Sequence, residues 1–488
     1  MHILNYKTLE NIGYDGFLLK DAPERVIQFG EGNFLRAFAD FFIDAANERS
    51  GFNAKVLVVQ PIAEGLAETI NKQDGLYTLY LRGVEDAAPI VRKRVISSIS
   101  RCINPHTEYS ALLDAAANPG LRFVISNTTE AGIVFDSACA FDDAPPRSFP
   151  AKLTRFLYER YNKGDKGLII FPCELIDDNG AELKKCVEKY TELWGLDKGF
   201  SEWLNVECLF CPTLVDRIVT GYPRGEAERL NAENGYEDKL LDTGEVFGLW
   251  VIEGPSWLKD ELPFEQAGLP VILTDDHKPY KQRKVRILNG AHTTMALAAL
   301  LAGKKTVGEC MADPVISGFV KKAVNEEIVP ALETGTSGAL PAAELETFAE
   351  AVFERFRNPY IEHSLLSISL NSVSKWRARV LPSVKAYIER FGKVPARLSF
   401  GFAALVEFYR KSLIKGEDCS VPAVSDTPEV LEFFKDYGHD LHAVCGAVNL
   451  WGEDLSALSG TDRLRFEDAV GGHLAAIGGK GIYDAIAN

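Results

Sequence analysis

A lysine, an asparagine and a histidine lie close together in the segment KVRILNGAHT, at Lys284, Asn289 and His292. A lysine with apolar neighbours can have its pKa lowered into the working range that a proton donor or acceptor needs. An asparagine amide can hydrogen-bond a carbonyl or an alkoxide, and a histidine can orient the lysine or the substrate. At about 100° per residue of an α-helix, all three side chains are expected to project toward one cleft. The alternative is that His292 is a core residue, because small and apolar residues flank it.

A Gly-x-Gly turn occurs in the segment VIQFGEGNFLR, after an apolar run and before a helical pattern. Gly30 would permit the tight turn, Gly32 would let a pyrophosphate approach the backbone, and the start of the helix would supply amide donors. The apolar spacing predicts one helix that ends at Ser50-Gly51. Leu35 replaces the third glycine of the usual fingerprint, so a plain strand-to-helix turn is the alternative. The predicted cofactor-binding residues are Ile27, Gln28, Phe29, Gly30, Glu31, Gly32, Asn33, Phe34, Leu35, Arg36, Ala37 and Phe38.

The end of the second apolar run bears on which nicotinamide cofactor would bind. This run ends at Gln60-Pro61, and Glu64 follows a little later. An acidic residue near this point can bind a ribose diol, whereas a 2′-phosphate needs a basic one. Because no Arg or Lys lies at this strand end, the sequence favours NAD over NADP.

Two further polar groups are candidates for substrate binding. Asp216 and Arg217 lie inside an apolar segment, where a charged residue needs a partner. They form either a structural ion pair or a contact to substrate. Lys375, Arg377 and Arg379, which follow His363, gather positive charge in an acidic chain and can receive a carboxylate. A solvated helix face is the alternative for this cationic group.

The pattern of elements predicts an α/β fold with two domains. Apolar runs rich in β-branched residues occur at 25–29, 55–59, 122–126 and 167–171, and they predict a doubly wound parallel sheet covered on both faces. Strand signals fade after Asp276, and the stretches 313–333, 342–357, 398–414 and 428–448 have helical spacing. We therefore expect a nucleotide-binding domain over 1–275 and a mostly α-helical substrate domain over 276–488.

Composition excludes several classes of function. The chain has 488 residues and a formal net charge of −16, which is the wrong sign for general binding to nucleic acid or anionic membranes. The N-terminal residues lack the apolar core of a signal peptide, and nine scattered cysteines are typical of a reducing compartment. Cys208 and Cys211 form a lone Cys-x-x-Cys without a second pair or nearby histidine, so we expect no metal site. A cytoplasmic enzyme is the expected class, and the sequence does not reveal its oligomeric state.

Several motifs together resemble those of the mannitol dehydrogenase family of long-chain polyol dehydrogenases. They are GEGNFLRAF from Gly30, QDGLY from Gln73, SNTTEAG from Ser126, PCELI from Pro172, LVDRIVTGYP from Leu214 and ILNGAH from Ile287. The resemblance runs from about residue 25 to about 400. It implies a Rossmann-type NAD-binding domain, a helical C-terminal domain and a site in the cleft between them. The family's Lys-x4-Asn-x2-His pattern falls on Lys284, Asn289 and His292, which makes Lys284 the general acid for ketone reduction, without a metal.

The resemblance is closest to the tagaturonate-reducing branch of that family, because Phe34-Leu35-Arg36-Ala37 replaces the Phe-His-Arg-Ala of other branches. It implies interconversion of tagaturonate and altronate. Leu175 stands where polyol-oxidising relatives have an Asn that shares alkoxide stabilisation, so either Asn289 acts alone or Glu174 assists it. The alternatives within the family are fructuronate reduction to mannonate and mannitol-type polyol oxidation. The alternatives outside it are a methyltransferase and a non-catalytic nucleotide-binding protein.

Overall fold

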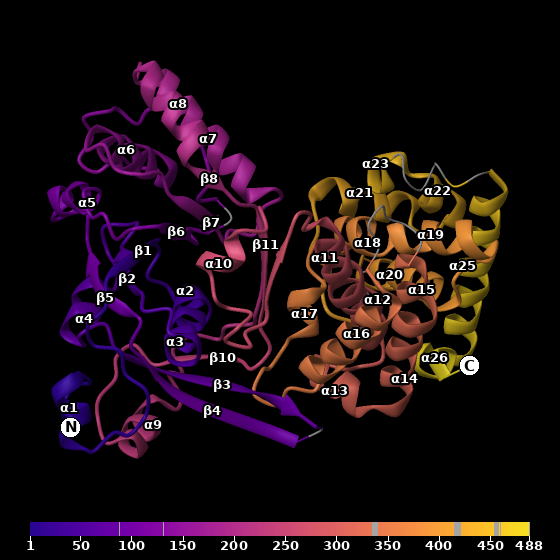
Figure 1. The fold of residues 1–488 in the computed structure, drawn as a ribbon. Coiled ribbons are helices and arrows are strands. Elements are labelled where there is room, and N and C mark those ends of the chain that lie inside the picture. The colour runs from indigo at the N-terminus through magenta and orange to yellow at the C-terminus, as the bar shows by residue number, and fades with distance from the viewer. Residues whose placement is uncertain are drawn as a thin grey trace. The chain divides into compact units, whose positions relative to one another are not determined.

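The computed structural model describes residues 1–86, 88–129, 131–333, 340–413, 421–452, 458 and 460–487. The chain forms two compact units, and Figure 1 colours it from indigo at the N-terminus to yellow at the C-terminus. Unit 1 comprises Met1–Arg82 and Ile90–His277, and unit 2 comprises Gly83–Pro89 and Lys278–Asn488. The assignment of cofactor binding to 1–275 and of substrate chemistry to 276–488 stays a prediction.

Unit 1 is built on a six-stranded parallel sheet. Its strand order is β5 (Ile99–Ile103), β2 (Lys55–Val59), β1 (Glu24–Phe29), β6 (Phe123–Ser126), β7 (Ile169–Pro172) and β8 (Leu209–Phe210). Every residue of β2, β6 and β7 is buried, as the continuous apolar runs predict. This is the 3-2-1-4-5-6 order of the Rossmann fold, whose strand order reverses between β1 and β6. The predicted fold class is confirmed.

Helices cover both faces of this sheet because successive strand residues point to opposite sides. Val26 of β1 packs into a core with Leu35 and Phe42, from α2 (Asn33–Ala37) and α3 (Ala39–Ser50). The neighbouring residues Ile27 and Phe29 pack into a second core on the other face. That second core includes residues of α5 (Tyr109–Ala115), α6 (Phe149–Asn162), α7 (Asn179–Leu193) and α8 (Lys198–Glu207). The remaining helices of unit 1 are α1 (Tyr6–Asn11), α4 (Ala67–Lys72), α9 (Ala227–Asn234) and α10 (Leu258–Glu261).

Two smaller sheets were not predicted from the sequence. One contains β10 (Asp242–Glu245), β3 (Tyr77–Glu85) and β4 (Ala88–Ile96), and the other contains β12 (Val271–Thr274), β11 (Leu249–Glu253) and β9 (Thr213–Asp216). In the second sheet β9 runs antiparallel to β11, whereas β12 runs parallel to it.

Unit 2 is mostly helical from Lys278 onward. Its central helix is α12 (Gly290–Leu301), in which every residue from Gly290 to Leu300 is buried and which packs on α20 (Ala396–Leu413). The other helices are α11 (Lys278–Arg283), η1 (Lys284–Asn289), α13 (Val307–Ala312), α14 (Pro314–Lys322), η2 (Ala323–Ile328), α15 (Val329–Leu332), α16 (Ala342–Phe356), α17 (Leu365–Ile368), α18 (Ser372–Arg379), α19 (Leu381–Phe391), α21 (Pro428–Tyr437), α22 (Leu441–Gly446), α23 (Val448–Trp451), α25 (Gly460–Lys480) and α26 (Ile482–Ala487). Among the residues described, none of the helices is long and apolar enough to span a bilayer.

Candidate functional site

The predicted Gly-x-Gly turn follows β1 at the carboxyl edge of the sheet, where its strand order reverses. Gly30 has a φ of 121°, and a Cβ on it would lie 2.7 Å from the carbonyl oxygen of Asn127, the residue after β6. Only glycine is tolerated at such a position. A Cβ on Gly32 would meet no atom within 4 Å. Gly30 therefore closes the turn against the next strand, and Gly32 leaves open space over the backbone, as a bound pyrophosphate requires.

The helix after this turn is broken, so the prediction of one continuous helix is wrong. The short helix α2 ends at Ala37, and α3 begins at Ala39 after Phe38, which has φ −122° and ψ −84°. The reason lies in side chains from distant parts of unit 1. The hydroxyl of Tyr77 donates to the carbonyl of Arg36 at 2.6 Å, and the Arg217 guanidinium donates to the carbonyl of Ala37 at 2.6 Å. The predicted end at Gly51 is confirmed, because Gly51 has the left-handed conformation of a helix cap.

Arg36, predicted as a cofactor ligand, has its guanidinium in the interior of unit 1. The residue is 1% exposed, and it donates to the carbonyl of Glu31 at 3.2 Å and to the side chain of Asn33 at 2.6 Å. It also donates to the carbonyl of Leu240 and lies 3.7 Å from the carboxylate of Asp242. These bonds brace the turn from beneath, so a direct contact between this guanidinium and a cofactor phosphate would require them to break.

The end of β2 is ordered by Gln60 rather than by an acidic side chain. Gln60 is 1% exposed, donates to the carbonyls of Ile62 and Ala63, and accepts from the amide of Ala67. Its side chain is therefore fully used in shaping the loop after β2. Burial raises the pKa of Glu31, in the middle of the Gly-x-Gly turn.

Glu174 and Asn127 fix the carboxyl ends of β6 and β7. The Glu174 carboxylate is 2% exposed and accepts hydrogen bonds from Ser126 and Thr128, each at 3.0 Å. The Asn127 amide donates to the carbonyl of Cys173 at 2.7 Å. Leu175, at the position of the missing asparagine, is 61% exposed. Glu174 thus stabilises the edge of the sheet that contains the cofactor turn, and its carboxylate oxygens are used in these hydrogen bonds.

Asp216 and Arg217, predicted as an ion pair or as substrate contacts, differ in what their side chains do. Arg217 donates to the carbonyls of Phe247 at 2.9 Å and of Ala37 at 2.6 Å, and its guanidinium lies over the ring of Phe41. Burial lowers the pKa of Arg217 to about 10. The guanidinium is therefore a structural group that joins α2 to the chain between β10 and β11. Asp216 is the last residue of β9 and is 5% exposed, and its role in substrate binding stays a prediction.

Lys284 and Asn289 are the first and last residues of the π-helix η1. In an α-helix these two residues would lie about 140° apart, at 100° per residue. In a π-helix the hydrogen bonds join residues five apart, so Asn289 lies one turn above Lys284 on the same face. Both residues are half-buried. The α-helical angles used in the sequence analysis are therefore wrong for this segment, and the π-helix brings the amine and the amide closer in orientation than predicted.

His292 lies on α12 in an enclosed aromatic and cationic environment. Its ring stacks on Phe356 with centroids 4.2 Å apart and meets His363 edge-on at 4.7 Å. Its Nε2 atom is buried and has no hydrogen-bond partner among the residues that the structure describes. Burial lowers the pKa of His292 well below its ordinary value, and the nearby positive charges of His363, Arg355, Arg379 and Lys375 lower it further. The imidazole is therefore neutral and keeps one polar atom for a ligand.

The structure brings three of the four predicted basic residues near His292. They are His363, Lys375 and Arg379, all half-buried. Burial lowers the pKa of Arg379, and Lys375 donates to the carbonyl of Ile368 at 2.9 Å. The fourth, Arg377, is exposed and its guanidinium lies against Gly452, where a Cβ would be 2.3 Å from Nη2. The cation set around His292 therefore excludes Arg377.

Arg355 is a member of this cationic group that the sequence analysis missed. It is 9% exposed, and its charge lowers the pKa of both His292 and His363. A signal was present, because Arg355 lies seven residues after Phe348 and three after Val352, on the apolar face that these two residues define on α16. A charged residue on the buried face of a helix needs a reason of this kind.

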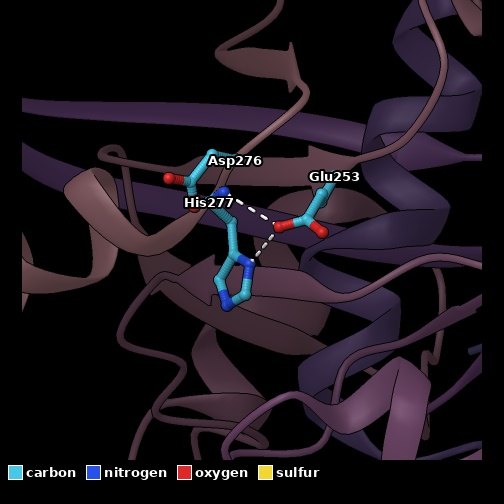
Figure 2. Close-up of side chains that lie close together, drawn as sticks. All are labelled: Glu253, Asp276 and His277. Atoms are coloured by element: carbon cyan, nitrogen blue, oxygen red, sulfur yellow. Dashed lines mark hydrogen bonds and ion pairs between the residues drawn. The ribbon is translucent and has the colours of Figure 1, made fainter. Parts of the chain in front are cut away.

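Glu253, Asp276 and His277 form a small cluster of residue types that can bind a metal ion (Figure 2). Their ligand atoms lie within 4.8 Å of one another. The carboxylate of Glu253 is 2.6 Å from Nδ1 of His277 and also accepts from its backbone amide at 3.1 Å, while Nε2 lies 3.7 Å from Asp178. Both imidazole nitrogens thus have carboxylate neighbours, and the cluster ties the end of β11 to the segment after β12. We assign no metal to it.

The isolated Cys-x-x-Cys has buried thiols. Burial raises the pKa of Cys208 and of Cys211 to about 12 in each case. Thiols of this kind are protonated at neutral pH and are poor nucleophiles and metal ligands. The pair is part of the packing of unit 1.

Two family models cover most of the chain. The mannitol dehydrogenase Rossmann domain matches residues 24–266, and the mannitol dehydrogenase C-terminal domain matches residues 276–459. The chain belongs to the mannitol dehydrogenase family. Its curated relatives include the altronate oxidoreductase of Pectobacterium carotovorum, 51% identical over 83% of this chain and 82% of that protein. The altronate oxidoreductase of Escherichia coli O7:K1 is 46% identical over 98% of this chain and 99% of that protein.

Solved structures show the same fold. A D-sorbitol dehydrogenase in substrate-free form has a TM-score of 0.83 and 23% identity, with 99% of this chain and 100% of that chain covered. The mannitol 2-dehydrogenase of Pseudomonas fluorescens, solved with NAD and D-mannitol, has a TM-score of 0.68 and 22% identity, with 99% and 98% covered. The predicted family and fold are therefore confirmed.

Proposed function

We propose that the protein is an NAD-dependent altronate oxidoreductase that interconverts tagaturonate and altronate. Relatives of that name are 46% and 51% identical over most of the chain. The observation in the structure that supports this most is the π-helix η1, which places a half-buried amine and a half-buried amide on one face. Cations gather around His292, close to η1 in sequence, in a protein whose net charge is −16. A cationic group of this kind suits a sugar acid better than an uncharged sugar.

The cofactor turn fits a dinucleotide. Gly30 closes against Asn127 and Gly32 leaves the backbone open, in a sheet of Rossmann order. The backbone amides that follow Gly32 would hold the pyrophosphate, while Gln28 and Arg36 hold the turn from beneath. When bound, the nicotinamide supplies or accepts the hydride at the carbon of the reacting C–O group.

The side chains of unit 2 handle the proton. In reduction, the ammonium of Lys284 donates its proton to the ketone oxygen as the carbon gains the hydride, so the carbonyl becomes an alcohol and the lysine becomes neutral. Asn289 donates a hydrogen bond to that oxygen and stabilises its developing negative charge. His292 is neutral and hydrogen-bonds a substrate hydroxyl through Nε2. In oxidation Lys284 accepts the proton back.

The carboxylate of the sugar acid is the natural partner of the cations near His292. Arg379 and Lys375 carry charge that burial makes costly to leave uncompensated. An anionic ligand offsets that cost, and an uncharged polyol does not. Asp216 is the candidate in unit 1 for binding a substrate hydroxyl.

The test is a spectrophotometric panel of tagaturonate, fructuronate and fructose with NADH. We expect the highest kcat/KM with tagaturonate. Lys284→Ala should lower kcat by at least about a hundredfold with little change in the Kd for NADH, because only the proton donor is lost. Lys411→Ala, an exposed lysine on α20, is the matched control. Near-normal turnover in Lys284→Ala would end its proposed role, and a preference for fructuronate or fructose would reassign the substrate.

The same panel tests the carboxylate site. Arg379→Gln should raise KM for tagaturonate by about tenfold or more, since it removes a charge-assisted hydrogen bond, and should leave any turnover of fructose unchanged. Arg377→Gln, on the same helix but directed at Gly452, should behave like the wild type. Equal effects of the two variants would contradict the assignment of Arg379.

A further inference from the structure

The cofactor turn rests on a buried polar pair, Gln28 of β1 and Asp40 of α3. Both side chains are 0% exposed. The amide Nε2 of Gln28 donates to the carbonyl of Gly30 at 3.0 Å and to Oδ2 of Asp40 at 3.2 Å. One side chain thus joins the glycine of the turn to the helix that begins after it. The position of the Gly30 carbonyl depends on this link.

The pair also contains two acceptors without donors. Oε1 of Gln28 and Oδ1 of Asp40 are buried and have no hydrogen-bond partner among the described residues. Exchanging the amide oxygen and nitrogen of Gln28 does not relieve this, because the oxygen would then face two other acceptors, Gly30 and Asp40. A proton on Oδ1 of Asp40 would turn one of these two acceptors into a donor. The amide of Gln28, which already bonds the other oxygen of the same carboxyl group, carries the second unpartnered acceptor.

The charges around Asp40 favour this neutral form. The pKa of Asp40 is raised to about 7, chiefly by burial; hydrogen bonding from Gln28 and the charge of Arg36 lower it, and the carboxylates of Asp44 and Asp242 raise it. Arg36 already donates to Glu31, Asn33 and Leu240, and Asp44 is paired with Arg94. The other titratable groups that sense the charge of Asp40 are Tyr77 of β3 and Cys102 of β5, and burial keeps both neutral. Three buried carboxyl groups therefore share two arginines.

We propose that Asp40 is a positioning residue that acts in its neutral form, in which it and Gln28 bond reciprocally and hold the Gly30 turn in the shape that receives the cofactor. This inference rests on the proposed binding of NAD at that turn. Ionisation of Asp40 breaks one bond of the pair and places a negative charge beneath the site of the pyrophosphate. Cofactor binding should therefore weaken as the pH rises through neutrality.

The test measures the Kd for NADH by fluorescence at about pH 6.5 and about pH 8.5. We expect the wild-type Kd to rise about tenfold between these values. Asp40→Asn copies the neutral acid, because its amide can both donate to Gln28 and accept from it, so its Kd should be low and nearly the same at both pH values. Asp40→Ala should bind weakly at both. Glu68→Gln, an exposed acid-to-amide change on α4, is the matched control and should follow the wild type.

Two results would overturn the proposal. One is that Asp40→Asn binds as weakly as Asp40→Ala, which would show that the charged carboxylate is needed; the other is that Asp40→Asn keeps the full wild-type pH dependence. Circular dichroism confirms folding, and if Asp40→Ala fails to fold, the comparison of Asp40→Asn with the wild type still decides. Because the assay needs no sugar, an error in the proposed substrate leaves it intact. A wild type that does not bind NADH at all would overturn both this role and the cofactor assignment.

Discussion

Gly30 and Gly32 stand two residues apart in the cofactor turn, yet the backbone gives them different tasks. Gly30 has a φ of 121° and no room for a Cβ, whereas Gly32 has an ordinary φ of −68° and open space around it. We expect Gly30→Ala to lower the free energy of unfolding by about 1–3 kcal/mol, because both strain and a backbone clash oppose it. Gly32→Ala should leave stability nearly unchanged but raise the Kd for NADH about tenfold or more, because its methyl group occupies the space for the pyrophosphate.

Thermal unfolding and NADH titration of the two variants measure these effects. The pair is informative because it separates folding from binding with the same chemical change. A Gly32→Ala variant with wild-type affinity for NADH would show that the cofactor does not lie on this turn. A Gly30→Ala variant of normal stability would contradict the geometry of the close approach to Asn127.

Candidate site residues could be identified from the sequence where their types and spacing are local features. The contacts that these residues make could not be predicted. Lys284, Asn289 and His292 were found from their types and spacing, and their roles remain predictions. Arg36 was predicted to bind the cofactor and Arg377 the substrate, and both stay predictions, because a cation in a motif carries no sign of what it contacts. Arg36 is held by carbonyls such as that of Leu240, about 200 residues away. Such long-range partners are decided by the packing of whole elements.

At the scale of elements, the four predicted strands correspond to β1, β2, β6 and β7 within two residues at either end. Their continuous apolar runs reflect burial on both faces, which a sequence displays directly. The short strands β8 and β9 and the break at Phe38 give no such signal. The break depends on hydrogen bonds from Tyr77 and Arg217, and the π-helix η1 differs from an α-helix by a hydrogen-bond register that residue types do not encode.

The junction of α12 with α18 sets the spacing between His292 and Arg379. A Cβ on Gly290, the first residue of α12, would lie 3.2 Å from the carbonyl oxygen of Arg379. We expect Gly290→Ala to push the two helices apart by a few tenths of an ångström and to raise KM for tagaturonate several-fold, because the cation and the imidazole no longer fit one ligand. Steady-state kinetics measures the change in KM against kcat.

Gly318→Ala on α14 is the control for helix propensity. Its Cβ would meet nothing within 4 Å, so this variant should gain about 0.5–1 kcal/mol of stability from the change to alanine alone. Gly290→Ala should gain the same helix propensity. If its melting temperature is lower than that of Gly318→Ala, the difference measures the cost of the close contact with the carbonyl oxygen of Arg379. If both variants are equally stabilised and KM is unchanged, the close approach does not set the geometry of the site.

At the scale of the whole molecule, the two units carry buried titratable groups of opposite kinds. Unit 1 contains Asp40 and Asp242, and burial raises the pKa of each to about 7. Unit 2 contains three histidines, His292, His363 and His473, whose pKa values burial lowers, and they outnumber Glu327, a buried acid of unit 2 whose pKa burial raises. The sequence shows only an acidic chain with eight histidines. Which of these groups are buried, and hence how each unit responds to pH, follows from the fold.

These groups predict opposite responses of the two units to acid between about pH 7 and pH 5. Unfolded Asp40 and Asp242 ionise near pH 3.9, so in this range the folded unit 1 binds more protons than its unfolded state, and acid stabilises it. Unfolded His292 takes up a proton near pH 6.5, whereas the folded residue does so only at lower pH, so acid destabilises unit 2. Each of these buried groups should contribute about 2 kcal/mol over this range.

Differential scanning calorimetry at the two pH values tests this prediction. NADH at about a hundred times its Kd should raise the free energy of unfolding of unit 1 by about 2.7 kcal/mol. The transition that moves to higher temperature when NADH is added is therefore that of unit 1. Acid should then move the two transitions in opposite directions, and His292→Gln should reduce the acid shift of unit 2 without affecting unit 1. If both transitions moved in the same direction, or if His292→Gln kept the full acid shift, the buried groups named here would not govern the response. Opposite shifts would also show that each unit unfolds on its own core, because a single cooperative molecule would average them.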